Sequence, residues 1–371
     1  MTTRLTFLLS KDPTTTRGGD VAMYELMREA VEAWAEVGVI CLSDGATSRD
    51  DGVVRVVKPP VAPSRLLARA IRRGRSLVHT RFDVDGLLPA IEAEETDGFV
   101  AVHSYMAETF LRSSRNGSVP LHVSREVSEA KVWAESARPG ARLEVPRIER
   151  DELRVARAAT SVATYDASDA EQLAARGVTA HRIPVVMTPT RQARVAESGP
   201  RLIFLGDRRW PPNAAAALQA VRLWPRISEG IDGAELLLVG HVGESTPDEL
   251  PPGVRNLGFV EHLGAVMGTA RGLLAPVDVG GGVRVKILDA ASHGLPVVGT
   301  TAAVGDLTEQ LGLEPYDGEA FVERCRALLL DADLAAEAGD ALYRRNAMQW
   351  DRRVTQHAVE RWLGREEAGH A

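Results

Sequence analysis

The stretch that decides the fold spans residues 273–300 and reads LLAPVDVGGGVRVKILDAASHGLPVVGT. Its apolar start predicts a strand, and the three glycines at 280–282 predict a turn into a helix that begins near Val283. Gly294 and Pro296 end that helix before a second apolar strand. This order of strand, turn, helix and strand predicts a parallel sheet with helices packed on it.

The glycine turn and the start of the helix form a place where an anion can bind. Gly280, Gly281 and Gly282 let phosphate oxygens approach the backbone N–H groups, and the positive end of the helix dipole attracts them. Lys286 in the first turn can neutralise a phosphate. Asp289 lies one turn later on the same face, where its carboxylate can accept hydrogen bonds from ribose hydroxyls. The alternative is an ordinary crossover whose glycines only turn the chain.

The whole stretch resembles the donor site of family 4 glycosyltransferases, which are retaining enzymes of GT-B fold. The branch in question has the order glycine, glycine, any residue, Arg, any residue, Lys and Ile-Leu, and Arg284 and Lys286 match its two basic positions. Asp289 stands where that family has its second glutamate, and Gly281 stands where it has its first. The resemblance implies that Arg284 and Lys286 bind a diphosphate. It also implies that backbone N–H groups of the glycine turn, or Asp278, replace the first glutamate at the donor sugar.

Composition limits the class of protein. A chain of 371 residues is long enough for two domains, and 44% hydrophobic with 26% charged residues is typical of a globular protein. The net charge of −7 argues against a partner nucleic acid. Cys41 and Cys325 are too few and too far apart for a disulfide framework or a zinc site, so we expect a reducing cytoplasm. No stretch reads as a signal peptide or a membrane span.

Two halves of the chain show the same alternation of strands and helices, which predicts an α/β protein with parallel sheets. We expect two Rossmann-like domains, 1–190 and 200–345, that face each other across a cleft. The polar segment between Pro184 and Pro200 separates them. The resemblance implies that the chain beyond about 346, within a helical stretch over 344–363, crosses back to the first domain. Strands are expected at 5–9, 39–43, 53–57, 98–103, 120–124, 161–164, 202–205, 236–239 and 254–260.

The second half carries further strand ends at which a nucleotide can bind. Gly206 allows close backbone approach, and Arg208 or Arg209 can reach a phosphate there, because ligands bind at the carboxyl ends of parallel strands. Pro212-Asn213 is expected to start the next helix at this nucleotide site, and these two residues can equally have no role beyond starting that helix. The resemblance also implies that backbone atoms after a later strand hold the nucleobase, at Gly258, Phe259 and Val260.

The first half carries candidates for the other side of the reaction. Arg17-Gly18-Gly19-Asp20 follows the first strand and matches the family's N-terminal glycine loop, which closes over the donor phosphates and the acceptor. His103 ends a predicted strand, where the family often has a histidine beside the transferred sugar; a structural histidine is the alternative. In an alignment on Trp133, Glu126 and Glu129 fall where a carboxylate could bind a hydroxyl or amino group of the acceptor, or remain a surface charge.

Residues 53–82 contain no acidic residue but are rich in arginine and lysine. The pattern predicts a basic amphipathic helix over 65–75, in which Leu66, Leu67, Ala70 and Ile71 form an apolar face opposite arginines. Such a helix could rest on anionic lipid headgroups, bind an acidic acceptor or be a solvated face. The basic residues are Arg55, Lys58, Arg65, Arg69, Arg72, Arg73, Arg75 and Arg81.

The chain lacks the motifs of dinucleotide dehydrogenases, P-loop hydrolases and serine hydrolases. We therefore expect a retaining hexosyltransferase with a UDP- or GDP-type nucleoside diphosphate sugar as donor and an unidentified acceptor: a cell-envelope glycan or lipid, or a small metabolite. The catalytic candidates are His103, Lys286, Arg208 and Arg209. No Asp-x-Asp pair stands at a strand end, so we expect no required metal or other cofactor.

Two alternatives remain from the sequence. One is a nucleotide-sugar-binding pseudoenzyme or partner-activating subunit, because Gly281 and Asp289 replace both acidic signature residues. The other is a sugar-nucleotide epimerase, which would need further acid and base groups. The expected location is the cytoplasm, with a peripheral contact to the inner face of the membrane through the helix at 65–75.

Overall fold

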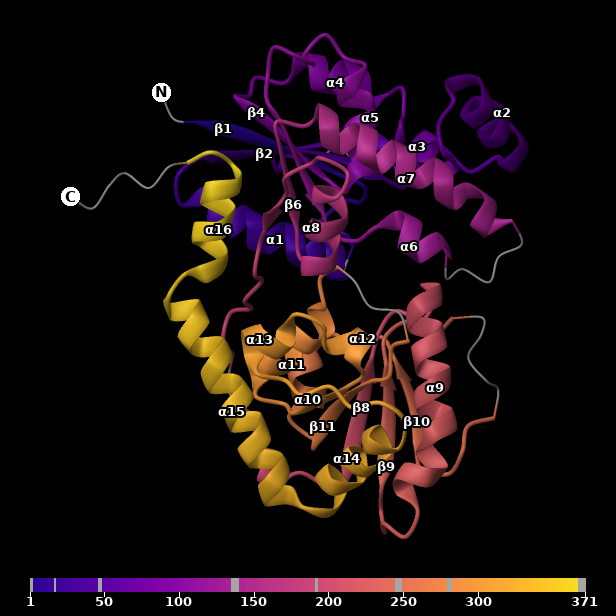
Figure 1. Ribbon diagram of the computed structural model, residues 1–371, viewed down its shortest axis with the longest axis vertical. Helices are drawn as coiled ribbons and strands as arrows, with labels where there is room; N and C mark the ends of the chain where they lie inside the picture. Colours follow the sequence, from indigo (N-terminus) through magenta and orange to yellow (C-terminus); the bar gives the residue numbers. More distant parts are fainter. Residues whose placement is uncertain are drawn as a thin grey trace, which may run out of the picture. The chain divides into compact units, whose positions relative to one another are not determined.

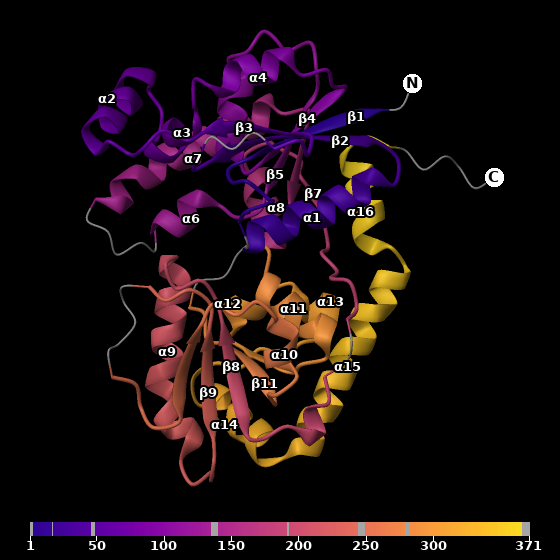
Figure 2. The ribbon, with the colours of Figure 1, turned by 180° about the vertical axis from the view of Figure 1, so that it is seen from behind.

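The computed structural model divides into two compact units, each built on one parallel sheet (Figure 1; Figure 2). Unit 1 comprises Met1–Pro184 and Thr355–Ala371, and unit 2 comprises Val185–Val354. None of the helices in the described part of the chain is long and apolar enough to cross a membrane. The structure describes residues 3–16, 18–45, 49–134, 140–190, 193–243, 249–278 and 282–365.

Unit 1 contains a seven-stranded parallel sheet in the order β3-β2-β1-β4-β5-β6-β7. All residues of the central strands β4 and β5 are buried, because helices cover both faces of the sheet. The register places Phe7 opposite Val39 on one side and Val100 on the other. The strands are β1 (Arg4–Leu9), β2 (Glu36–Ser43), β3 (Val53–Val57), β4 (Gly98–Val102), β5 (Leu121–Arg125), β6 (Ser161–Thr164) and β7 (His181–Arg182).

The helices of unit 1 form two layers. Figure 1 and Figure 2 show α1 and α8 on one face of the sheet and α3, α5 and α7 on the other. The second layer buries an apolar core that includes Leu8, Phe99, Phe110 and Ile148. The helices are α1 (Gly19–Glu32), α2 (Pro63–Arg73), α3 (Leu77–Phe82), α4 (Leu87–Ala93), the 3₁₀ turn η1 (Ser104–Met106), α5 (Ala107–Leu111), α6 (Glu129–Ala134), α7 (Ala141–Ala158) and α8 (Ala167–Ala174).

Unit 2 contains a five-stranded parallel sheet in the order β10-β9-β8-β11-β12. Trp224 is fully buried, and its Nε1 donates to the backbone oxygen of Pro252 at 3.0 Å. The strands are β8 (Arg201–Leu205), β9 (Glu235–Val239), β10 (Val254–Gly258), β11 (Gly272–Ala275) and β12 (Val297–Gly299). The helices are η2 (Val195–Glu197), α9 (Pro211–Ser228), α10 (Leu263–Met267), α11 (Val285–His293), α12 (Thr301–Val304), α13 (Leu307–Leu311), α14 (Gly318–Leu330) and α15 (Ala332–Asp351).

The last helix of the chain, α16 (Val354–Trp362), packs in unit 1. Trp362 is buried there, and its backbone oxygen accepts a hydrogen bond from Ser161 Oγ at 2.9 Å. The single helical stretch expected over 344–363 is wrong, because α15 ends at Asp351 and Arg353 adopts a φ of +51°. A left-handed residue cannot continue a right-handed helix.

Helix α2 begins and ends two residues earlier than the expected range of 65–75. It spans Pro63–Arg73, and of the expected apolar face Ala70 is buried whereas Leu67 and Ile71 are 46% and 62% exposed. The inward side carries arginines instead: Arg73 pairs with Asp83, and the neighbouring Arg69 pairs with Asp85. These two carboxylates, just beyond the acid-free stretch, draw Arg69 and Arg73 toward the protein, and much of the predicted apolar face lies toward solvent.

Candidate functional site

Lys286 lies between the N-termini of two helices at the carboxyl edge of the unit 2 sheet. It is the second residue of α11, which begins at Val285, two residues after the expected start. Its Nζ donates to Asn213 Oδ1 at 2.8 Å and lies 5.2 Å from the centroid of the Phe204 ring. Asn213 is in the first turn of α9. Two helix dipoles and one ammonium therefore give this edge a positive character.

Burial disfavours the charged forms of Lys286 and Asp289 on α11. Burial lowers the pKa of Lys286 to about 8. Burial raises the pKa of Asp289 to about 6, and the nearby His293 acts in the opposite direction. Lys286 therefore remains mainly protonated and Asp289 mainly ionised at pH 7. Two half-buried opposite charges one helical turn apart are what a ligand with phosphate and hydroxyl groups would stabilise.

The turn that precedes α11 is described only in part. Gly280 and Gly281 lie outside the described residues. Gly282 has a φ of +66°, a conformation that glycine adopts without a steric penalty. Asp278 follows β11, and with the Gln219 amide oriented to donate, its nitrogen lies 2.9 and 3.1 Å from the two carboxylate oxygens of Asp278. Helix α9 thus contacts Lys286 through Asn213 and contacts Asp278, beside the turn, through Gln219.

Arg284 immediately precedes α11. Its Nη1 donates to the Gly282 oxygen at 3.4 Å. The guanidinium lies against Gly305, at the end of α12, where an added Cβ would collide with it. Arg284 is therefore turned toward the loop between α12 and α13.

The two arginines after β8 have different environments. Arg208 is 3% exposed, and its Nη2 donates to Asn256 Oδ1 at 2.7 Å and to the Gly240 oxygen at 3.1 Å. Its Nε and Nη1 have no hydrogen-bond partner in the described part of the chain. Arg209 is exposed and pairs with Asp207 at 2.6 Å. Arg208 thus keeps two donors available for an anionic or carbonyl group, whereas the charge of Arg209 is balanced by its neighbour.

The ends of β8, β9 and β10 lie close together. A side chain at Gly240 would collide with the backbone of Gly206, and a side chain at Gly206 would meet Asn213. His241 stacks on Phe259, with ring centroids 4.9 Å apart and an interplanar angle of 16°. Phe259 is 50% exposed.

The loop that carries this stack is the one expected to hold a base. Gly258 ends β10 with a φ of +67°, and Val260 is half-buried just beyond Phe259. The backbone of the expected base-binding residues therefore lies beside an exposed aromatic face.

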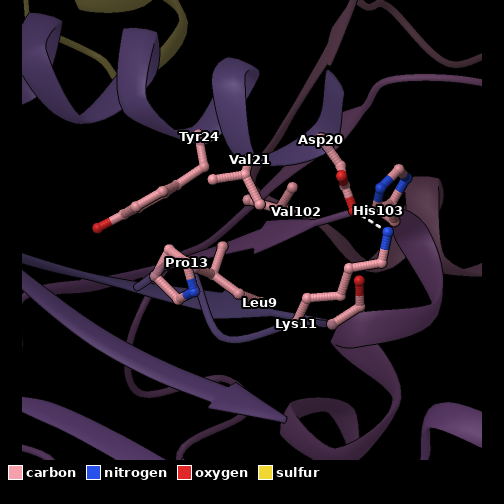
Figure 3. A pocket seen from close by; sticks show the side chains of 9 residues that line it. Leu9, Lys11, Pro13, Asp20, Val21, Tyr24, Val102 and His103 are labelled. Atoms are coloured by element: carbon pink, nitrogen blue, oxygen red, sulfur yellow. Dashed lines mark ion pairs between the residues drawn. The ribbon is translucent and has the colours of Figure 1, made fainter. Parts of the chain in front are cut away.

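Unit 1 contains a pocket at the carboxyl ends of β1 and β4 (Figure 3). Lys11 and Asp20 form an ion pair of 2.8 Å within it. Gly18 and Gly19 start α1 directly before Asp20, and Arg17 lies outside the described residues. The pocket is lined by Leu9, Ser10, Lys11, Pro13, Asp20, Val21, Tyr24, Val102 and His103.

His103 borders this pocket in a strained conformation. Its φ of +71° is in a region that a non-glycine residue rarely adopts, and such strain concentrates at functional sites. Its Nε2 lies 3.6 Å from Glu126 Oε2, and its ring stacks on Tyr105 with centroids 5.0 Å apart. Nδ1 has no partner in the described chain.

Burial controls the protonation of this pair. It lowers the pKa of His103 to about 4, with Lys11 acting in the same direction and Asp20 against it. Burial raises the pKa of Glu126 well above its usual range. His103 is therefore a neutral imidazole near pH 7, which can exchange hydrogen bonds with a hydroxyl group.

The second predicted carboxylate, Glu129, lies apart from this pair. Burial, with the charge of Glu152, raises the pKa of Glu129 to about 7. Glu152 itself accepts hydrogen bonds from Arg125 at 3.0 Å and from Ser128 at 3.1 Å. Glu129 thus belongs to a network of carboxylates and donors at the start of α6.

Most arginines of the acid-free stretch have carboxylate partners. Arg55 is buried and pairs with Asp12 at 2.7 Å and Asp51 at 2.6 Å. Arg75 lies 3.7 Å from both Glu108 and Asp151. The stretch therefore supplies structural ion pairs in addition to any surface for a ligand.

Sequence reasoning missed several of these residues. Lys11 was not singled out, although it follows the first strand directly. Asn213 was assigned only to the start of a helix, and no role was predicted for His241, which follows the strand expected at 236–239. The rule that ligands bind at carboxyl ends of parallel strands could have identified Lys11 and His241. No group of three or more His, Cys, Asp or Glu side chains in the described ranges is placed to hold a metal ion.

Comparisons with known proteins agree with this architecture. Residues 199–331 match the family model described as Glycosyl transferases group 1. No curated protein matches the chain. Sucrose-phosphate synthase from Thermosynechococcus elongatus has a similar structure, with a TM-score of 0.71, 16% identity and 97% of each chain covered.

Two other solved structures are similar over nearly the full length. WaaG, a glycosyltransferase involved in lipopolysaccharide biosynthesis, has a TM-score of 0.67 at 14% identity, with 97% of this chain and 100% of WaaG covered. HepE from Anabaena, in complex with UDP and glucose, has a TM-score of 0.65 at 12% identity, with 97% and 99% covered. Residues 199–331 therefore match the glycosyl transferases group 1 model, and the chain as a whole has a GT-B fold like that of these structures.

Proposed function

We propose that this protein transfers a hexose-type sugar from a nucleoside diphosphate sugar to an acceptor, with retention of anomeric configuration and without a metal ion. The observation that carries the proposal is the position of Lys286 between the N-termini of α11 and α9, inside the segment that matches the glycosyltransferase family. Positive charge at that place suits the diphosphate of the donor and the charge that develops on it as it leaves.

The donor groups can be assigned to residues of unit 2. Lys286 and the glycine turn, including Gly280, Gly281 and Gly282, would hold the diphosphate, and Asp289 would accept hydrogen bonds from the ribose. Arg208 supplies two unpartnered N–H groups next to the ends of β9 and β10. The base would lie along residues 258–260, where the exposed face of Phe259 offers a surface for stacking.

Unit 1 would bind the acceptor. The hydroxyl group to be glycosylated would lie in the pocket beside His103, whose neutral imidazole can orient it. In the reaction the acceptor oxygen forms a bond to the anomeric carbon. The bond from that carbon to the diphosphate oxygen breaks with its electron pair, and the hydroxyl proton ends on the released diphosphate.

A panel of nucleoside diphosphates and their sugars tests the donor first, by the shift in thermal unfolding temperature. Release of the nucleoside diphosphate with candidate acceptors then tests transfer, and NMR of the product tests retention. We expect turnover that persists in EDTA. Loss of turnover in EDTA would contradict the metal-independent mechanism, and donor binding without turnover on any acceptor would favour the pseudoenzyme.

We also propose that unit 1 makes a peripheral contact with an anionic membrane, at its inner face, through α2. Leu67 and Ile71 point to solvent, and Arg65 and Arg72 are exposed on the same helix. An exposed apolar edge flanked by arginines suits the boundary between acyl chains and anionic headgroups.

Sedimentation with vesicles tests this contact. We expect binding to vesicles that contain phosphatidylglycerol, weaker binding to pure phosphatidylcholine, and loss of binding in the double variant Leu67→Ser/Ile71→Ser. Leu143→Ser is the matched control, because Leu143 is 81% exposed on α7. Equal losses in the two variants would refute the assignment to α2.

A further inference from the structure

Two half-buried cations of the acid-free stretch have no carboxylate partner among the residues that the structure describes. Lys58 directly follows β3, and Arg81 lies in the last turn of α3. Both are half-buried, and in the described part of the chain no carboxylate lies within ion-pair distance of either. Arg55, Arg69 and Arg73, by contrast, all have such partners. Lys58 and Arg81 thus differ from the arginines of the same stretch that form structural ion pairs.

The charge of Arg81 disfavours the charged form of Lys58. Burial lowers the pKa of Lys58 to about 8, and the positive charges of Arg81 and Lys11 contribute in the same direction. Burial lowers the pKa of Arg81 as well. Asp44 is close enough to favour the charged form of both, but only in part. In the unliganded protein, Asp44 and the face of Phe82 offset only part of the cost of burying these charges, so an anion would stabilise the two cations further.

A ladder of stacked rings connects Lys58 with the pocket beside His103. Lys58 Nζ lies 4.2 Å from the centroid of the Phe82 ring. Phe82 stacks on Tyr105 with centroids 4.1 Å apart, and Tyr105 stacks on His103 at 5.0 Å. The carboxyl ends of β3, β1 and β4 lie along one edge of the sheet, which places Lys58, Lys11 and His103 on that edge.

We propose that Lys58 and Arg81 bind the phosphate monoester of a soluble, hydroxyl-bearing acceptor such as a phosphorylated sugar or polyol, whose reacting hydroxyl lies in the pocket beside His103. The proposal rests on the proposed glycosyl transfer for the role of the hydroxyl, and on the two cations for the phosphate. Lysine and arginine bind phosphate through charge-assisted hydrogen bonds, and the two stacked rings between Lys58 and His103 set the span that the body of a small acceptor would cover.

Isothermal titration calorimetry with inorganic phosphate tests the site. The protein is first saturated with UDP or GDP, whichever binds, so that the site at Lys286 is filled. We expect one further phosphate to bind, with affinity at least tenfold weaker in Lys58→Met and in Arg81→Gln and nearly restored in Lys58→Arg. Arg142→Gln, which removes an exposed cation from the first turn of α7, is the control and should bind phosphate as wild type does.

Proton exchange provides a readout that a purely structural role would not move. Sulfate binds no proton near pH 8, but its charge would raise the pKa of Lys58 from about 8. Sulfate binding at pH 8 should therefore take up protons in the wild type and not in Lys58→Arg. Sulfate binding with the same proton uptake in the wild type and in Lys58→Arg would overturn the proposal.

Matched soluble ligands complete the test. Glucose 6-phosphate and glycerol 3-phosphate should bind and compete with phosphate, whereas glucose and glycerol should bind at least tenfold more weakly. Equal binding of the charged and uncharged ligands, or a Lys58→Met variant with unchanged affinity, would refute the phosphate site. Failure of UDP and GDP to bind would instead contradict the proposed donor site, and phosphate binding could still be measured without them.

Discussion

Replacing Lys286 by methionine should weaken donor binding without destabilising the protein. The substitution keeps the length of the side chain and removes its charge and its hydrogen bond to Asn213. A hydrogen bond between an ammonium and a phosphate contributes about 1.5–3 kcal/mol. Loss of this contact should therefore raise the Kd of the nucleoside diphosphate by about 10- to 150-fold.

The effect on stability has two opposing parts. Loss of the bond to Asn213 costs about 1 kcal/mol. Burial lowers the pKa of Lys286 from 10.5 to about 8, so the charged form is less favourable in the folded protein by about 3 kcal/mol before allowance for partial exposure. The methionine variant relieves that penalty. Its free energy of unfolding should equal or exceed that of the wild type.

The same pKa predicts how donor binding depends on pH. Lys286 loses its proton as the pH rises through about 8, so the wild-type affinity should fall between pH 7 and pH 9, whereas that of Lys286→Met should stay level. Calorimetry with UDP and GDP measures the affinity, and urea denaturation measures stability. Arg226→Met, at the opposite end of α9, is the control. An unchanged affinity, or a loss of stability above about 2 kcal/mol, would refute the reasoning.

Five other substitutions test separate parts of the structure. Asp289→Asn should weaken donor binding. The raised pKa of Asp289, about 6, makes the folded wild type lose stability as the pH rises from about 4 to 6. The variant should not show this loss when its stability is measured by urea denaturation between pH 4 and 8. Arg208→Met should lower donor affinity at least tenfold in calorimetry, whereas Arg209→Met should change it less than threefold, because Asp207 already balances Arg209; the reverse order would contradict this assignment. Trp362→Ala should cost about 3–5 kcal/mol in urea denaturation, because it empties the site at which α16 packs. Arg353→Gly should stabilise the chain by about 1 kcal/mol in the same assay, since glycine adopts the positive φ without strain; a destabilised variant would show that the Arg353 side chain contributes more than its backbone costs.

The fold was largely predictable because the strands carry a strong local signal. Runs such as Val53–Val57 and Ser161–Thr164 were expected at the residues where the structure has them. The break at Arg353 was not predictable, because the preceding and following residues share one helical pattern and the break comes from a single backbone angle. The start of α11 and both ends of α2 differ by two residues from the expected positions, because the geometry of a helix end depends only weakly on residue type.

The candidate site was predictable by position but not by side-chain direction. The sequence placed Arg209, Arg284 and Lys286 at a phosphate, and all three do lie at strand or helix ends. Their directions depend on neighbours that only the fold brings close: Asp207 turns Arg209 aside, Gly305 accommodates Arg284, and Asn213 holds Lys286. A positive charge in the sequence therefore indicates a ligand only after its intramolecular partners are known.

Applied to the acid-free stretch, residues 53–82, this criterion distinguishes Lys58 and Arg81 from the other half-buried cations. In the sequence, the basic residues of this stretch follow one another with no acidic residue between them, which suggests that all of them share one function. In the structure, carboxylates from outside the stretch, such as Asp12 and Asp83, pair with some of these arginines. Lys58 and Arg81 have no such partner in the described chain, and burial still disfavours their charges. Because evolution can remove an unused buried charge by a single substitution at little cost to stability, a cation that stays half-buried without a carboxylate is better evidence for a bound anion than the number of basic residues around it.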